Sequence, residues 1–243
     1  MESYRQTAYK NYIKTHLAHP PSAEDLKRQS YVLKARFGPF LPTDRRSKIL
    51  ELGCGHGTLL YFLKDHGYTS IDAVDVSEEQ VQLAKSFGFQ NVARGDLVDF
   101  LQRCEPASYQ LVFMLDVIEH FKKDEIATLL ALVWRSLKPD GRLVIYTPNA
   151  EGPFGARYRY GDLTHEIAFT PQSLAQLLRL SRFERIQFRP VEPYVHGLIS
   201  LARWVTWKTI KTFLRFYLLA ETGSYRGYLL TQSMIAVAEK VDV

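Results

Sequence analysis

The sequence has little cysteine and no long apolar run. Among its 243 residues are two cysteines, Cys54 and Cys104, which are too few and too isolated for a disulfide framework or a thiolate metal site. No apolar stretch approaches the roughly 20 residues that a membrane-spanning helix needs. Residues 1–14 carry charges throughout, unlike a secretory signal. These absences predict a reducing, cytoplasmic setting.

Acidic residues are also in short supply. The chain has 26 Asp and Glu against 31 Lys and Arg, a formal net charge of +5. Such an excess favours acidic partners, namely nucleic acid, anionic lipid head groups or phosphorylated sugars, although many soluble enzymes are as basic without one. With 46% hydrophobic residues the chain is long enough for one sizeable α/β domain with additions.

The chain does contain an apolar run that breaks into alternating glycines. Residues 49–52 predict a short buried strand, and residues 58–66 predict the helix after it. Gly53, Gly55 and Gly57 between them allow a tight reversal and leave no Cβ between the backbone and a ligand, while the helix start offers free N–H groups to an anion. The spacing does not match the dinucleotide fingerprint, whose third glycine is missing.

Three further expected strands lead to acidic residues. One ends in Asp75, about 20 residues past the glycines, where a doubly wound fold places an acid on a cofactor's ribose. A second ends at Asp96, and the most apolar strand, 109–115, delivers Asp116 to the carboxyl edge of the sheet, where ligands bind. The expected helices cover 2–17, 22–37, 77–87, 124–137 and 170–180, and the other strands 142–146, 183–191 and 232–238.

These segments resemble the class I S-adenosylmethionine (SAM)-dependent methyltransferases over about residues 48–190. The matching stretches are E-L-G-C-G-H-G (51–57), Asp75, Asp96, D-V-I-E-H (116–120) and L-K-P-D-G-x-L-V-I (137–145). The resemblance implies a doubly wound, Rossmann-like sheet of seven mostly parallel strands with the last antiparallel, SAM as cofactor and S-adenosylhomocysteine as product. The implied cofactor contacts are Glu51, Gly53, Cys54, Gly55, Gly57, Asp75, Val76, Asp96, Leu97, Leu115 and Asp116, with Glu51 on the ammonium group and Asp96 and Leu97 on adenine.

A single methyltransferase domain is expected over residues 1–243. Its parts are an N-terminal helical cap (1–45), a SAM-binding core (46–193), an apolar and basic helical insertion (194–228) and the last strand (229–243). Within the insertion, Lys208, Lys211 and Arg215 fall on one helical face and apolar residues on the others. Residues 198–219 are therefore expected at a membrane surface, as a lid, or at a dimer contact.

The expected chemistry is methyl transfer to oxygen. An in-line displacement requires alignment of the reactants and removal of the hydroxyl proton. The segment 116–120 differs from the N/D-P-P-Y/F of amino-methylating enzymes, and no Pro-Cys nucleophile of cytosine methylation is present. His165, and after it His120, are the expected proton acceptors because histidine titrates near neutral pH.

A divalent metal is an alternative that the sequence does not favour. Asp116, Glu119 and His120, followed later by His165, resemble the metal-binding pattern in the O-methyltransferases of ubiquinone biosynthesis and of small-RNA 3′ ends. Asp116 stands where those enzymes carry a glutamate, and its shorter side chain argues against metal. Many metal-free relatives also read V-I-E-H.

The expected acceptor is a glycan or a lipid-linked sugar. The segment G-D-x-T-H-x-x-x-F-T-P-x-S-L (161–174) resembles methyltransferases of polysaccharide and lipopolysaccharide assembly. A connection as long as 151–170 is usually functional, and the residues expected on a sugar or phosphate are Arg157, Tyr158, Arg159 and Tyr160. Such an enzyme would work in the cytoplasm or peripherally on the inner membrane face. The alternatives are a quinone or lipid acceptor, an RNA 2′-hydroxyl, disfavoured because no aromatic-basic nucleic-acid module is visible, and a non-catalytic SAM-binding protein.

Overall fold

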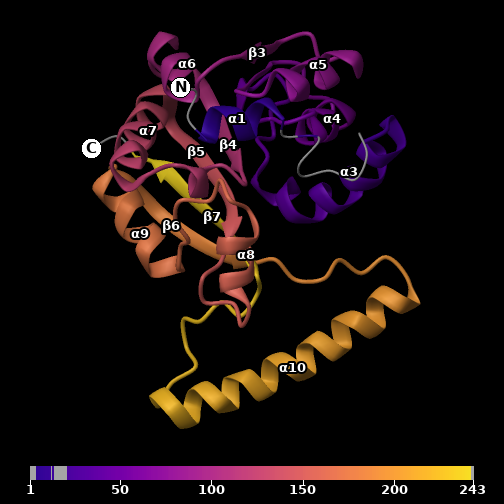
Figure 1. The fold of residues 1–243 in the computed structure, drawn as a ribbon, viewed down its shortest axis with the longest axis vertical. Helices are drawn as coiled ribbons and strands as arrows, with labels where there is room; N and C mark the ends of the chain where they lie inside the picture. The colour runs from indigo at the N-terminus through magenta and orange to yellow at the C-terminus, as the bar shows by residue number, and fades with distance from the viewer. Residues whose placement is uncertain (1–3, 12, 14–20, 242–243) are drawn as a thin grey trace.

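A seven-stranded sheet forms the centre of the molecule (Figure 1). The computed structural model describes residues 4–11, 13 and 21–241. The strand order is β3-β2-β1-β4-β5-β7-β6, and every neighbouring pair is parallel except the two that β7 makes. The strands are β1 (Ile49–Leu52), β2 (Ile71–Asp75), β3 (Val92–Arg94), β4 (Tyr109–Leu115), β5 (Leu137–Pro148), β6 (Phe183–Pro190) and β7 (Ser233–Lys240). This confirms the doubly wound fold, in which the order of the strands reverses between β1 and β4.

Helices cover both faces of the sheet. One apolar core lies between the sheet and α6, α7 and α9, and two more lie under α3, α4 and α5 (Figure 1). The helices are α1 (Tyr4–Lys10), α3 (Ala23–Phe37), α4 (Thr58–Asp65), α5 (Glu78–Ser86), α6 (Leu97–Arg103), α7 (Lys123–Ser136), α8 (Gly155–Gly161), α9 (Pro171–Leu180) and α10 (Leu198–Thr222), with short 3-10 turns η1 (Gly38–Phe40) and η2 (Ile118–His120). Because both faces are covered, the central strands are almost continuously apolar.

The expected helix starts are built as their residues predict. Ser22 accepts a hydrogen bond from the backbone N–H of Asp25, and the Asp25 carboxylate accepts from the backbone N–H of Ser22. Ser77 caps α5 by accepting from the backbone N–H of Gln80. Of the N-terminal helix expected over 2–17, the part Tyr4–Lys10 forms α1, while residues 2, 3, 12 and 14–17 lie outside the described residues.

Three boundaries differ from expectation. β5 begins at Leu137, whereas the strand was expected at 142–146: Leu137 pairs with Tyr109, and the next pair is Arg142 with Leu111. β3 ends before Asp96, which instead caps α6 by accepting from the backbone N–H groups of Val98 and Asp99. The expected loop 151–170 contains α8.

The insertion before the last strand is one long helix. α10 spans 25 residues and lies apart from the sheet and its covering helices, joined to them by residues 191–197 and 223–232 (Figure 1). Ser200 is its one buried residue. Within the described part of the chain, no helix is apolar over a stretch long enough to cross a membrane.

Candidate active site

The glycine turn opens a cavity between the ends of β1 and β4. Gly53 has φ +72°, and a Cβ there would lie 2.4 Å from Val117 Cγ2, in the segment that follows β4. Gly57, with φ +93°, forms the N-cap of α4, and a Cβ there would lie 2.8 Å from Phe89 Cδ2. A side chain at either position would strain the backbone and displace a packed neighbour.

The cavity has a volume of about 500 Å³ and is bordered by the carboxyl edge of the sheet and by the N-terminal helices. Ten of the eleven expected cofactor residues border it: Glu51, Gly53, Cys54, Gly55, Asp75, Val76, Asp96, Leu97, Leu115 and Asp116. The structure thus gathers side chains from four strand ends on one hollow. Gly57 is not among the bordering residues, and it forms the N-cap of α4 instead.

Carboxylates dominate the floor of the cavity. Glu51 is 3% exposed, and its Oε2 has no hydrogen-bond partner among the described residues. Burial and the neighbouring Asp75 raise the pKa of Glu51 well above its usual range. Asp75 accepts hydrogen bonds of 2.8 Å from the backbone N–H groups of Gly55 and Ser77. Buried acids of this kind favour a ligand that carries positive charge.

Arg36, which the sequence analysis did not single out, supplies a cation at the same cavity. It lies in the last turn of α3, and its buried Nε has no partner within the described ranges. Arg5, Tyr9 and Gln29 also reach the cavity from the N-terminal helices. The expected cap over the cofactor was the only sequence signal for these four. The cavity therefore offers one ligand a carboxyl oxygen and a guanidinium N–H, each without a hydrogen-bond partner among the described residues, as an amino acid moiety requires.

Two histidines lie against each other beside the cavity. His120 borders the cavity and His165 packs behind it, with ring centroids 4.7 Å apart. The Thr164 hydroxyl donates to Asp162 Oδ1 (2.6 Å), so its oxygen accepts from His120 Nδ1, 2.9 Å away. His165 Nδ1 donates to the carbonyl of Tyr158 (2.7 Å). Both rings therefore hold their proton on Nδ1 and leave Nε2 as the acceptor.

Buried acids lie beside the histidine pair. Burial lowers the pKa of His120 to about 4, with a further lowering from His165. Burial raises the pKa of Asp116 to about 6, and burial together with Asp116 raises that of Glu119 well above its usual range. Glu119 is fully buried and accepts from Thr147 Oγ1 (3.0 Å). At neutral pH His120 is therefore uncharged and can accept a proton.

Of the four metal candidates, three are brought together. Ligand atoms of Glu119, His120 and His165 all lie within 4.8 Å of one another, a grouping that does not include Asp116. Two imidazoles and one carboxylate form a donor set that first-row divalent ions accept. The same three residues thus suit either a metal or a shared proton.

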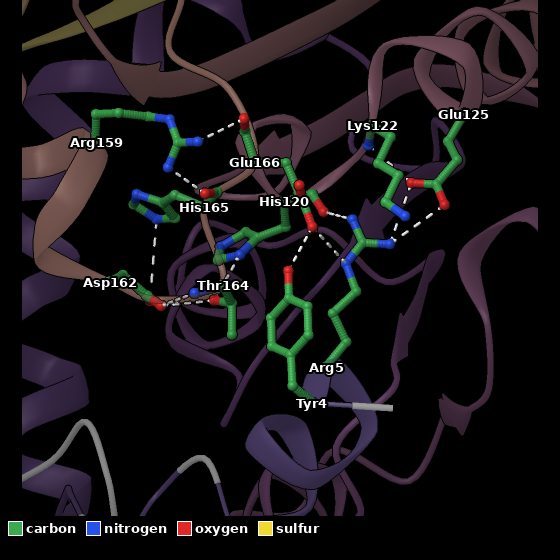
Figure 2. A network of polar contacts seen from close by, with 10 residues as sticks. All are labelled: Tyr4, Arg5, His120, Lys122, Glu125, Arg159, Asp162, Thr164, His165 and Glu166. Carbon is green, nitrogen blue, oxygen red and sulfur yellow. Dashed lines mark hydrogen bonds and ion pairs between the residues drawn. The ribbon is translucent and has the colours of Figure 1, made fainter. Parts of the chain in front are cut away.

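The N-terminal helix α1 is tied over the histidines (Figure 2). Arg5 pairs with Glu125 (3.1 Å) and with Glu166 (3.5 Å), and it also donates to the carbonyl of His120. Tyr4 donates to Glu166 at 2.5 Å. α1 thereby closes one side of the cavity with contacts to η2, α7 and the 162–166 loop.

The four expected substrate residues do not border this cavity. Arg157 and Tyr160 are exposed, Tyr160 by 78%. Tyr158 donates to Gln232 Oε1 (2.7 Å). Arg159 donates to the carbonyls of His165 and of Glu166, the latter at 2.7 Å, and so holds the histidine loop in place (Figure 2).

Comparison with known proteins agrees with this geometry. The family model of the methyltransferase domain matches residues 16–187, well over half of the chain. The chain belongs to this methyltransferase family. Its cofactor is therefore SAM, which supplies an activated methyl group on a sulfonium. The cavity suits that molecule, because Glu51 can take the ammonium group, Arg36 the carboxylate of the methionine part, and Asp75 the ribose hydroxyls.

Individual relatives are more distant. A ubiquinone biosynthesis O-methyltransferase of Neisseria meningitidis serogroup C is 26% identical over 110 residues, 43% of this chain and 45% of that protein. An S-adenosyl-L-methionine-dependent Diels-Alderase, iccD, of Talaromyces variabilis is 34% identical over 117 residues, 43% of this chain and 39% of that protein. The chain thus spans less than half the length of these curated relatives.

A solved SAM-dependent methyltransferase from Archaeoglobus fulgidus superposes with a TM-score of 0.64 at 20% identity, covering 87% of this chain and 94% of that one. At this identity the likeness establishes the fold and says nothing about the acceptor. The strand order and the antiparallel β7 are thus those of a known methyltransferase architecture.

Proposed function

We propose that this methyltransferase transfers the methyl group to a hydroxyl of a glycan or lipid-linked sugar, with the histidine pair as proton acceptor. The observation that supports it is the content of one cavity: the carboxylates expected on the cofactor border it, and so does His120, whose Nε2 has no partner among the described residues. A hydroxyl acceptor must lose a proton as the new bond forms, so a neutral imidazole at this position has a defined role.

Thr164 and Asp162 are positioning residues for this step. The carboxylate of Asp162 accepts a hydrogen bond from the Thr164 hydroxyl, so Thr164 presents a lone pair to His120 Nδ1–H. That bond keeps the Nε2 lone pair on the acceptor side of the ring. As His120 accepts the hydroxyl proton, its charge is stabilised through Thr164 by the same carboxylate. His165, whose Nε2 lies 3.9 Å from Asp162 Oδ2, is the second proton acceptor that we propose.

The residues that we assign to the acceptor lie on α8, just before the loop that carries Thr164 and His165. Arg157 and Tyr160 extend from α8 into solvent beside it and can hydrogen-bond to or stack on a sugar or phosphate. Arg159 and Tyr158 are already engaged, so we assign them the task of holding this loop.

Donor-label transfer tests the proposal. Labelled SAM is offered with glycan, quinone and RNA acceptors, with and without a chelator, and we expect transfer to the glycan class with no effect of the chelator. His120→Ala should lower kcat by roughly 10²- to 10⁴-fold while S-adenosylhomocysteine affinity stays the same. Thr164→Val, which removes the tautomer bond without emptying the site, should lower kcat by roughly tenfold.

The alternatives give different results in the same screen. Transfer to a quinone would identify the acceptor class of the Neisseria relative. Loss of activity with chelator, restored by a divalent ion, would assign Glu119, His120 and His165 as metal ligands. RNA transfer would be expected to weaken steeply with salt. If the wild type and His120→Ala both bound the cofactor and neither transferred a methyl group to any acceptor, an enzymatic role would be contradicted.

A further inference from the structure

The outward face of α10 is an apolar surface far larger than isolated exposed side chains produce. Nine large apolar residues of this helix are between 43% and 86% exposed: Leu198, Ile199, Leu201, Val205, Ile210, Phe213, Phe216, Tyr217 and Leu219. Because α10 lies apart from the sheet, these side chains do not belong to the core that folds the domain (Figure 1). They need another explanation.

Charge is confined to one side of α10. At 3.6 residues per turn, the exposed apolar residues and the small uncharged residues between them occupy about half of the helix circumference. The charged residues occupy the remainder: Arg203, Lys208, Lys211, Arg215 and Glu221. A two-stranded coiled coil buries only a narrow seam. An apolar sector this wide fits a surface into which the whole side of the helix can sink.

Ion pairs set the direction in which this face points. Lys208 and Lys211 bind the carboxylate of Glu192 at 2.7 and 2.5 Å, on the connection that leaves β6. Lys208 Nζ also lies 4.8 Å from the centroid of the Trp204 ring. The charged side of α10 is thereby held toward the connection that leaves β6, and the apolar side is turned away from that connection.

The net charge of the insertion indicates the kind of surface that α10 meets. Residues 191–228 contain five Lys and Arg against two Glu, which supplies most of the excess positive charge of the chain. Such a segment is attracted to anionic head groups, while its apolar face is buried at the boundary with the acyl chains. Spanning is not required for this, and no helix among the described residues is suited to spanning.

We propose that α10 binds flat on a bilayer that contains anionic phospholipids. The connections to α10 leave from the end of β6 and return at the start of β7, where Pro190 pairs with Met234 and Ser233 with Pro148. This is the carboxyl edge of β5, the edge on which the active-site cavity opens. The bound helix therefore holds the cavity beside the membrane, where lipid-linked acceptors reside.

Vesicle sedimentation of the full chain tests this proposal. The wild type should co-sediment with vesicles of phosphatidylcholine mixed with phosphatidylglycerol, and less with phosphatidylcholine alone. The double variant Phe213→Ser/Phe216→Ser should reduce the partition coefficient at least about tenfold. The matched control Phe154→Ser/Leu180→Ser removes two apolar side chains elsewhere that are at least 65% exposed, as Phe213 and Phe216 are, and should bind as the wild type does. Both variants should keep wild-type affinity for S-adenosylhomocysteine.

A second variant isolates the charge. Arg203→Gln/Arg215→Gln should weaken binding to the mixed vesicles severalfold, and high salt should reproduce that loss in the wild type. The proposal is overturned if the wild type sediments with neither vesicle, or if it is a dimer in solution that Phe213→Ser/Phe216→Ser dissociates without any vesicle binding. No acceptor or methyl transfer enters this measurement, so its result is independent of the proposed reaction.

Discussion

The cofactor core and α10 use apolar residues in opposite ways. Phe113 of β4 is fully buried and packs edge-to-face on Phe37 at 5.8 Å between ring centroids, whereas Phe213 of α10 is 70% exposed. In the core, apolar side chains set the positions of strand ends and hence of Glu51, Asp75 and Asp116. In α10 they form a face that the domain does not cover. Apolar side chains therefore have two roles here: those in the core build the site, and those on α10 form the face that we propose to bind a membrane.

The largest expected contrast is in stability. Phe113→Ala should lower the free energy of unfolding by about 3–5 kcal/mol, because it leaves a cavity in a packed core. Phe213→Ala should change it by less than about 0.5 kcal/mol. Urea denaturation of the two variants measures both. Equal losses would mean that α10 packs on the domain in solution and would remove the contrast.

A smaller effect is expected at the glycine turn. Gly53→Ala places a Cβ against Val117 at a positive φ and should weaken SAM binding roughly 10- to 100-fold, from a strain of about 1–2 kcal/mol plus the displacement of Val117. Gly67→Ala is the control, because Gly67 also has a positive φ, +83°, but nothing lies within 4 Å of its Cβ position. Calorimetry should show unchanged affinity for that variant. Similar losses in both would indicate a global effect of backbone strain.

The acids of the cavity predict that SAM affinity depends on pH, with an effect of the same order as that of Gly53→Ala. Burial raises the pKa of Asp116 to about 6, so its carboxyl is protonated below that pH and ionised above it. A cationic cofactor binds the ionised form better, and SAM affinity should therefore fall as pH drops through 6, by up to about tenfold per pH unit. Asp116→Asn should give a shallower pH profile. A wild-type affinity independent of pH between 5 and 7 would contradict this assignment.

The smallest expected effect concerns the contacts of α1. Arg5→Gln breaks the pairs with Glu125 and Glu166, which are partly exposed, and should raise KM for SAM no more than about fivefold. Arg28→Gln is the control, because the Arg28–Asp25 pair lies on the solvent side of α3, with Arg28 79% exposed. If vesicles changed the KM for SAM of the wild type but not that of Arg5→Gln, α1 would be linked to the membrane-facing region.

The sequence predicted the fold through local patterns. Apolar runs ending in glycine or acid located the strand ends, and the order of those ends implied the family, because parallel strands bring their carboxyl ends to one edge. This is why ten of the eleven expected cofactor residues border one cavity. Arg36 was not predicted, because a helical repeat does not show which side chain will reach a cavity beside a distant glycine turn.

Local sequence thus determined the sheet, the glycine turn, the acids at strand ends and the amphipathic character of residues 198–222. Only the tertiary structure decided which histidine meets the cavity, which nitrogen of His120 carries the proton, and which way the apolar side of α10 points. Each of these depends on contacts between residues far apart in the chain, such as Thr164 with His120 and Glu192 with Lys211. Helical and strand periodicity report which residues share a face, whereas packing alone determines what that face meets.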